Sequence, residues 1–429
     1  MGFERFKLDS KITEVLRTID ITTPTPIQQS LIPVLKQNAN AIVSAKTGSG
    51  KTLAFLLPIL EAIISKPTTH HYPKAFILAP TKELASQIYE VVGYFSKELG
   101  LHRALLQGGA NIEHEKRVLR NGSDIIVATP QRAKEHIKNR DFDIKSIKHF
   151  VIDEADMAFD MGFVGYIEEF LSQISKNAQK VIVSATITPR VVKLAKSYIK
   201  PIRRIEVDAS NKVSDSVTHH IYPVLKSKKN ELLAWMISNN NYGKVLLFVR
   251  KKEIANTLEE VLKEWGYKVG VLHGQKQHNE RKKALNAFKS GKLDILIATD
   301  IAARGLDIAG LNIVISYDIP HIKQDFIHRV GRTGRANTQG VAITLVSPDE
   351  IEQLKDLYKL LGERIQEIIL NDFAPKDVKA RGYLLQAPQR RRKAKPTKPK
   401  NTSPLNKKGK KRKTTKRDGF KIYDMQKKK

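Results

Sequence analysis

Three carboxylates within four positions are the side chains of this chain best suited to chemistry. Asp153, Glu154 and Asp156 end the stretch V-I-D-E-A-D, directly after two apolar β-branched residues. Carboxylates this close repel one another unless a cation neutralises them, and Mg²⁺ bound to nucleotide phosphates does so through oxygen ligands. An acidic helix start after a buried strand is the alternative, because Asp and Glu favour the first turn of a helix. A phosphate-loop sequence further upstream favours the magnesium nucleotide.

That loop reads A-K-T-G-S-G-K-T and lies between a predicted strand at residues 41–43 and an apolar helical run. Strand, Gly-rich turn and helix N-terminus form the context in which backbone N–H groups hold phosphates. Lys51 would reach the β- and γ-phosphate oxygens, and Thr52 would ligate Mg²⁺. Ala45 takes the place of the usual first glycine. The predicted nucleotide-binding residues here are Ala45, Lys46, Thr47, Gly48, Ser49, Gly50, Lys51 and Thr52.

A second nucleotide signal precedes the loop in T-T-P-T-P-I-Q-Q, residues 22–29. A buried Gln28 amide can donate and accept at once, which the N6 and N7 edge of adenine requires. An ordinary surface glutamine is the alternative reading of this residue alone.

Strands and helices alternate along most of the chain, which predicts an α/β fold with parallel sheets. We expect strands at residues 41–43, 75–79, 104–106, 125–128, 151–152 and 181–183, and then at 217–222, 245–249, 269–272, 295–298, 313–317 and 341–346. The expected organisation is an adenine-recognition lead-in at 1–37, a nucleotide-binding domain at 38–207, a polar linker at 208–216, a second α/β domain at 217–373 and a tail at 374–429. The loops that follow the strands gather at one edge of a parallel sheet, where α/β proteins bind ligands.

The second domain has no phosphate loop but carries H-R-V-G-R-T-G-R, residues 328–335. Arg332 and Arg335 are three positions apart, so a helix start can direct both to one side. Arginines presented to a nucleotide held by another domain suit the arginine-finger role in phosphoryl transfer. A solvated basic face is the alternative.

Charge indicates a polyanionic partner, because the net charge is +31. Residues 376–429 hold 22 Lys and Arg against three Asp and Glu, a net +19 that leaves +12 for the rest of the chain. Such a segment lacks the apolar residues to order itself, so we expect a disordered polybasic tail that binds nucleic-acid phosphates. A solubility or targeting segment is the alternative.

Several functions are disfavoured by composition. The chain has no cysteine, so disulfides, thiolate metal sites and cysteine nucleophiles are excluded. The sequence shows neither a signal peptide nor an apolar run long enough to span a membrane. We therefore expect a cytoplasmic monomer, although K-K-G-K-K-R-K in the tail also resembles a nuclear signal.

Taken together, D-E-A-D, A-K-T-G-S-G-K-T, P-T-K-E-L-A, S-A-T, A-T-D-I-A-A-R-G-L-D and H-R-V-G-R-T-G-R occur in the order of one family. The chain resembles a DEAD-box ATP-dependent RNA helicase over about residues 1–370. D-M-G-F at residues 160–163, the compact core and the basic tail are most similar to the bacterial RhlE-type subgroup. The resemblance implies two tandem RecA-like domains, ATP and Mg²⁺ as ligands, and single-stranded or short duplex RNA as partner, in ribosome assembly or RNA turnover.

The resemblance also implies roles for individual residues. At the base, Phe3 would stack near adenine and Gln28 would read its edge. At the phosphates, Asp153 would position Mg²⁺ and Glu154 would activate the attacking water. Asp307 would reach the nucleotide from the second domain, Arg332 and Arg335 would contact the γ-phosphate, and Lys51 completes the set of predicted catalytic residues. Ser184, Thr186 and His328 couple hydrolysis to domain closure. The RNA contacts are Pro80, Thr81, Lys82, Gly108, Gly109, Thr129 and Arg132 in the first domain and Arg281, Thr299 and Gly305 in the second.

Some positions depart from the family pattern. Lys82 replaces an arginine and loses its bidentate fork, Gln131 replaces a glycine, and His278 takes the place of a glutamine. These changes put RNA affinity in doubt more than ATP chemistry. A non-enzymatic RNA-binding protein, a DNA-directed motor, and an ATP-gated clamp that does not unwind remain as alternatives.

Overall fold

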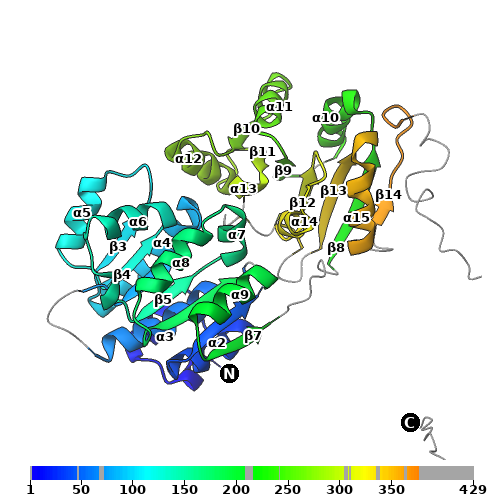
Figure 1. Cartoon of the computed structure of the whole chain (residues 1–429). Helices are drawn as coiled ribbons and strands as arrows, with labels where there is room; N and C mark the ends of the chain where they lie inside the picture. The colour runs from blue at the N-terminus through cyan, green and yellow to red at the C-terminus, as the bar shows by residue number, and fades with distance from the viewer. Residues whose placement is uncertain are drawn as a thin grey trace, which may run out of the picture. The chain divides into compact units, whose positions relative to one another are not determined.

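Two parallel sheets, each with helices on both faces, form the described part of the chain (Figure 1). The structure is a computed structural model that describes residues 2–45, 48–66, 72–207, 216–240, 242–303, 308, 311–334, 339–361 and 365–375. All of them belong to the unit Met1–Ala387, and the second unit, Pro388–Lys429, lies outside the described residues. The predicted tail and most of the predicted linker therefore remain predictions.

The first sheet has the strand order β3-β4-β2-β5-β6-β1-β7, and all of its pairs are parallel. Its strands are β1 (Asn40–Ser44), β2 (Ala75–Leu78), β3 (Arg103–Leu106), β4 (Ile125–Ala128), β5 (His149–Ile152), β6 (Gln179–Ser184) and β7 (Ile202–Glu206). The inner strands are almost wholly apolar because both of their faces are buried.

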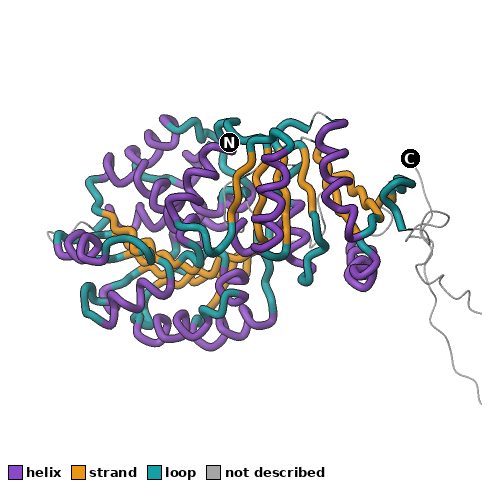
Figure 2. The backbone as a smooth tube through the Cα atoms, turned by 90° about the horizontal axis from the view of Figure 1, so that it is seen from above, coloured by secondary structure: helices purple, strands orange, loops and turns teal. Residues whose placement is uncertain are grey.

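Alternate residues of these strands belong to two separate cores, one on each face of the sheet. Ala41 and Val43 pack on one face, and Ile42 packs on the other. The first face is covered by η1 (Phe3–Phe6), α1 (Ser10–Thr18), α2 (Pro26–Lys36), α3 (Lys51–Ile64) and α4 (Lys82–Leu99). The second is covered by α5 (Ile112–Arg120), α6 (Pro130–Lys138), η2 (Ile144–Ser146), α7 (Ala155–Asp160), α8 (Val164–Gln173) and α9 (Pro189–Tyr198). Figure 2 shows the strands between these helical layers.

The second sheet is also fully parallel, with the order β10-β11-β9-β12-β13-β8-β14. Its strands are β8 (Val217–Pro223), β9 (Val245–Val249), β10 (Val269–Leu272), β11 (Ile295–Thr299), β12 (Ile313–Ser316), β13 (Gly340–Val346) and β14 (Ile365–Glu367). Helices α10 (Lys229–Asn239) and α11 (Lys252–Glu264) cover one face, and α12 (His278–Lys289), α13 (Asp300–Ala303), α14 (Lys323–Val330) and α15 (Ile351–Leu361) cover the other. Short turns η3 (Lys226–Lys228) and η4 (Pro348–Glu350) complete the described elements.

A buried ion pair fastens α10 of this domain to η4. Lys229 Nζ lies 2.6 Å from Glu350 Oε2 and 3.5 Å from Asp318 Oδ1, and all three side chains are almost completely buried. Buried charges persist only when they are paired, so this network fixes the turns that follow β12 and β13.

The register of the first sheet brings the predicted ATP and RNA segments to one edge. Leu78 is opposite both Ala128 and Ile152, and Ser44 is opposite Ser184. The segments after these residues leave the carboxyl ends of β1, β2, β4, β5 and β6 together. The predicted α/β class and both parallel sheets are confirmed, and all twelve predicted strands are present. Strands β7 and β14, at the sheet edges, were not predicted. No helix among the described residues is long and apolar enough to cross a membrane.

Candidate active site and nucleic-acid contacts

A buried ion pair joins the phosphate loop to the carboxylate cluster. Lys51 Nζ lies 3.0 Å from Glu154 Oε1 and also donates to the Ala45 carbonyl at 3.1 Å. Both side chains are less than a tenth exposed. Burial acts to lower the pKa of Lys51, but the carboxylates of Glu154 and Asp153 outweigh it, so the pKa is raised and the ammonium keeps its charge. The fold therefore places the charged Lys51 ammonium against Glu154, the carboxylate predicted to activate water.

Glu154 itself has an unusual backbone. Its φ of 47° lies in the left-handed region, which costs a residue with a Cβ about 1–2 kcal/mol. The residue forms the N-cap of α7, where β5 turns into the helix. Strained residues held this way concentrate at functional sites, and the side chain of this one contacts Lys51.

Asp153 and Thr52 are the residues that would hold Mg²⁺, and their chemistry fits that ion. Asp153 is buried, and Thr52 is the second residue of α3, directly after Lys51. Burial and then the neighbouring Glu154 carboxylate raise the pKa of Asp153 to about 7. A buried carboxylate of this kind gains from a divalent cation, and one carboxylate plus a hydroxyl is a common protein share of an Mg²⁺ shell. No cluster of three His, Asp or Glu suited to a metal occurs among the described residues, so phosphates and water would supply the other ligands.

The glycines of the phosphate loop hold the backbone in conformations closed to other residues. Gly48 and Gly50 have φ values of 80° and 89°. A Cβ on Gly50 would come within 2.5 Å of Gln28 Nε2. Ser49 Oγ is buried and has no hydrogen-bond partner among the described residues. A buried hydroxyl of this kind is suited to bind a phosphate oxygen. Lys46 and Thr47 lie outside the described residues.

Gln28 contacts the phosphate loop directly. Its Oε1 accepts the Thr25 N–H at 2.9 Å, and its Nε2 donates to the Gly50 carbonyl at 3.2 Å. The predicted adenine reader is therefore buried and bonded in both directions. Phe3 is also buried, in edge contact with Phe6 at 6.0 Å between ring centroids. Its stacking on adenine stays a prediction.

Asp156 holds the S-A-T segment against the carboxylate cluster. Its Oδ2 accepts from both the N–H and the hydroxyl of Thr186, at 2.8 and 2.7 Å. Ser184 Oγ accepts the Asp156 N–H at 3.1 Å and donates to the Thr186 carbonyl. Two of the three predicted coupling residues, Ser184 and Thr186, are thus bonded to the same acidic segment that carries Asp153 and Glu154.

The predicted RNA contacts of the first domain lie on three neighbouring loops. Thr81 caps α4 by accepting the Leu84 N–H, Pro80 precedes it, and Thr129 begins α6. Lys82 extends over the glycine turn, since a Cβ on Gly109 would meet Lys82 Nζ at 3.1 Å and one on Gly108 would meet its Cε at 3.6 Å. Arg132 NH2 donates to the Ala110 carbonyl, next to the same turn. Most of these predicted contacts are therefore brought together.

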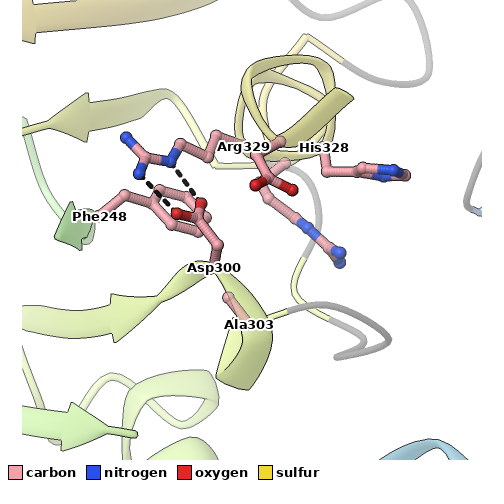
Figure 3. A pocket seen from close by; sticks show the side chains of 7 residues that line it. Phe248, Asp300, Ala303, His328 and Arg329 are labelled. Carbon is pink, nitrogen blue, oxygen red and sulfur yellow. Dashed lines mark hydrogen bonds and ion pairs between the residues drawn. The ribbon is translucent and has the colours of Figure 1, made fainter. Parts of the chain in front are cut away.

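In the second domain a different arginine occupies the centre of the site (Figure 3). Arg329 is 1% exposed and binds Asp300 through two nitrogens, at 2.6 and 2.8 Å, while its third donates to the Asp318 carbonyl at 2.6 Å. The guanidinium also lies 5.2 Å from the centre of the Phe248 ring. The His328 ring extends to the other side of α14. Arg329, Asp300 and Phe248 were not among the predicted site residues.

The remaining predicted residues of this domain are placed in part. Arg332 is buried in the turn after α14, Thr299 ends β11, and Arg281 lies in the first turn of α12. Arg335, Asp307 and Gly305 lie outside the described residues, so their roles stay predictions.

Sequence comparison assigns the class of protein that this fold and site define. Residues 25–195 match the DEAD/DEAH box helicase family, and residues 228–337 match the helicase conserved C-terminal domain. The chain belongs to the DEAD-box family and has its tandem RecA-like domains.

Individual relatives agree with this assignment. The chain is 33% identical to the ATP-dependent RNA helicase DbpA of Bacillus subtilis, over 85% of this chain and 76% of that protein. It is 35% identical to the ATP-dependent RNA helicase DeaD of Buchnera aphidicola, over 88% of this chain and 62% of that protein. The chain thus spans less than two thirds of the DeaD relative. The structure of S. cerevisiae Dbp5 bound to RNA and ADP BeF3 superimposes with a TM-score of 0.78 at 28% identity, covering 86% of this chain and 96% of Dbp5.

Proposed function

We propose that this chain is an RNA-stimulated ATPase that couples ATP hydrolysis to local separation of short RNA duplexes and remodelling of RNA–protein complexes. The observation that carries the proposal is the buried Lys51–Glu154 pair at the carboxyl edge of the first sheet. It sets a phosphate-binding cation beside an acid that can take a proton from water. The Dbp5 structure, with both RNA and a nucleotide bound, supports the same pair of ligands here.

In this proposal the chain's own residues divide the chemistry. Bound Mg²⁺ neutralises phosphate charge, and Thr52 and Asp153 would hold it. Lys51 binds phosphate oxygens, Glu154 takes a proton from the attacking water, and Arg332 with Arg335 stabilises the charge that develops on the γ-phosphate. Asp156 transmits the state of this site to Ser184 and Thr186 through the bonds described above.

RNA binding would use backbone contacts from the loops around Thr81, Gly108 and Thr129, with Arg281, Thr299 and Gly305 in the second domain. Closure of the two domains on ATP and RNA would bend one strand and separate a short duplex, and loss of phosphate would reopen them. The polybasic tail would tether the core to structured RNA and raise its local concentration there.

Finer assignments belong to the same proposal. Residues 160–163, D-M-G-F, and the basic tail favour the RhlE-type subgroup. They also favour a cytoplasmic role on ribosomal or other ribonucleoprotein RNA. The alternative of an ATP-gated clamp is kept, because a clamp and an unwinding enzyme share this ATP site.

The test compares RNA and DNA oligomers of one sequence as activators of steady-state ATP hydrolysis at one fixed salt concentration, because salt changes phosphate binding strongly. We expect activation by RNA and little by DNA. Equal activation would favour the DNA-directed motor, and no activation by either would leave a non-enzymatic RNA-binding protein. Displacement of a labelled strand from a short RNA duplex then separates unwinding from clamping.

A further inference from the structure

A buried histidine lies between two carboxylates beneath the predicted RNA-binding loops of the first domain. His136, on α6, is fully buried. Its Nε2 lies 2.9 Å from Glu115 Oε2, on α5, and its Nδ1 lies 2.8 Å from Asp141 Oδ2, just after α6. Both imidazole nitrogens therefore face carboxylate oxygens at hydrogen-bond distance.

This geometry requires one more proton than a neutral histidine and two carboxylates contain. Neutral imidazole has one N–H and one lone pair, whereas an ionised carboxylate only accepts. One of the two contacts would then place lone pair against lone pair in a buried site, which is costly. An imidazolium donates to both carboxylates and removes the conflict.

The carboxylate of Glu115 connects this histidine to the RNA loops. Glu115 Oε1 accepts the Gln107 N–H at 2.9 Å, immediately before the Gly108–Gly109 turn. Glu115 Oε2 also lies 3.4 Å from Arg132 NH1, and Arg132 donates to the Ala110 carbonyl immediately after that turn. The glycine turn is thus held at both ends by groups that converge on Glu115.

We propose that His136, held as an imidazolium between Glu115 and Asp141, is a positioning residue for RNA binding. While the ring is charged, Glu115 is fixed so that it orients both Arg132 and the glycine turn. When the ring loses its proton, one carboxylate must turn away, and the RNA loops lose a common support. This inference rests on the proposed RNA contacts at Gly108, Gly109 and Arg132.

The charges around the ring determine the direction of the pH effect. Burial acts to lower the pKa of His136, but the hydrogen bonds to Glu115 and Asp141 outweigh it, so the pKa is raised above the usual 6.5. The support is therefore complete below the unfolded-state pKa and is lost as pH rises through the folded-state pKa. Arg132 also faces Glu135 at 3.3 Å, while Lys134 of α6 pairs with Glu169 of α8 away from the ring. Of the charged groups on the described elements around it, Glu115 and Asp141 contact the ring.

The decisive variant is Glu115→Gln. Its amide oxygen can still accept the Gln107 N–H, and its amide NH₂ can donate to a neutral His136 Nε2 while Nδ1–H donates to Asp141. The two bonds of the ring and the bond to Gln107 are then satisfied without the extra proton, while Arg132 loses the carboxylate oxygen that faces its NH1. His136→Gln removes the cation. As a matched control, His114→Gln changes an exposed histidine on α5, the helix that carries Glu115.

The measurement is the RNA concentration that half-activates ATP hydrolysis by the full chain, together with kcat, from about pH 6.5 to about pH 9.5. For wild type and His114→Gln we expect the half-activating concentration to rise with pH by about tenfold while kcat at saturating RNA stays constant, the loss expected for one charged hydrogen bond. The half-activating concentration of Glu115→Gln should not change with pH, at a value above that of wild type at low pH because Arg132 has lost its contact with Glu115, and that of His136→Gln should stay high throughout.

Parallel pH curves for wild type and Glu115→Gln would overturn the inference, as would a pH effect confined to kcat. Lys82→Ala separates this failure from failure of the proposed RNA site. If Lys82→Ala leaves RNA activation unchanged, the RNA site itself is misplaced. If Lys82→Ala weakens activation and the His136 and Glu115 variants match wild type, only the role of His136 is wrong.

Discussion

Glu154→Gln tests the most direct consequence of the buried ion pair. The change keeps the shape of the side chain and an oxygen that can accept from Lys51, but it removes the proton acceptor. General-base catalysis contributes about 10²–10⁴-fold, so we expect kcat with saturating RNA to fall by that factor, or about 3–5 kcal/mol in the barrier. The KM for ATP should change little, because the lysine and the glycine turn remain.

The stability cost of this substitution should be smaller than for most buried ion pairs. Removing one partner usually costs about 3–5 kcal/mol because the other charge is left alone. Here Asp153 lies beside the same lysine, and its pKa of about 7 is raised in part by Glu154. With Glu154 neutral, Asp153 ionises more readily and compensates Lys51, so we expect a loss of about 1.5–3 kcal/mol in unfolding free energy, the size of one charged hydrogen bond.

The assay is steady-state ATP hydrolysis with and without single-stranded RNA, with urea unfolding on the same samples. Glu168→Gln, an exposed acid on α8, is the matched control and should behave as wild type. A folded Glu154→Gln protein whose kcat stays within about tenfold of wild type, or about 1.4 kcal/mol, would refute the assignment of Glu154 as the base.

A lysine in the Arg329→Lys variant cannot form the bidentate ion pair with Asp300, so we expect calorimetry to show a lower unfolding temperature. Adding Asp300→Asn to the same variant should lower that temperature little further. Glu350→Gln leaves Lys229 without its nearest carboxylate and should cost about 3 kcal/mol at neutral pH. Burial acts to raise the pKa of Glu350, but Lys229 outweighs it and the pKa is lowered, so this difference is present above the unfolded pKa of 4.5 and shrinks as pH falls through the folded pKa. Urea unfolding across that range measures it. Gln28→Glu keeps an acceptor and loses the amide donor, so the KM for ATP should rise with kcat little changed, as ATP titrations will show.

The sequence predicted all the inner strands and the edge strands β3 and β10, and it missed the other two edge strands, β7 and β14. Strand β7, I-R-R-I-E, has three charged residues in five positions, and its side chains are mostly exposed. Strand β14 has only three residues. Hydrophobic patterning did not detect these two strands, because one is mostly charged and the other is too short to show a pattern.

The candidate site was predictable where one short segment carries the chemistry. The phosphate loop and the D-E-A-D segment are such segments, and the register of β1, β5 and β6 brings them together. Arg329 lies beside Arg332 in the same motif, but its partner Asp300 is 29 positions earlier in the chain. Only the fold, which brings Arg329 of α14 to Asp300 at the start of α13, reveals that Arg329 holds these elements together. The contact of Arg332 with the nucleotide stays a prediction.

The contacts of Lys51 link nucleotide binding to activation of the base. Lys51 Nζ, which the phosphate-loop motif assigns to phosphate oxygens, bonds Glu154 and the Ala45 carbonyl in this structure. An ammonium has three donors, and these two bonds use two of them, so a phosphate oxygen can accept from the third. A phosphate oxygen competes with Glu154 for the same cation, so we expect the contact between Lys51 and Glu154 to lengthen when ATP binds and the carboxylate to become available to water. In the proposed mechanism Lys51 therefore holds Glu154 while the site is empty and releases it to the attacking water as the phosphates bind.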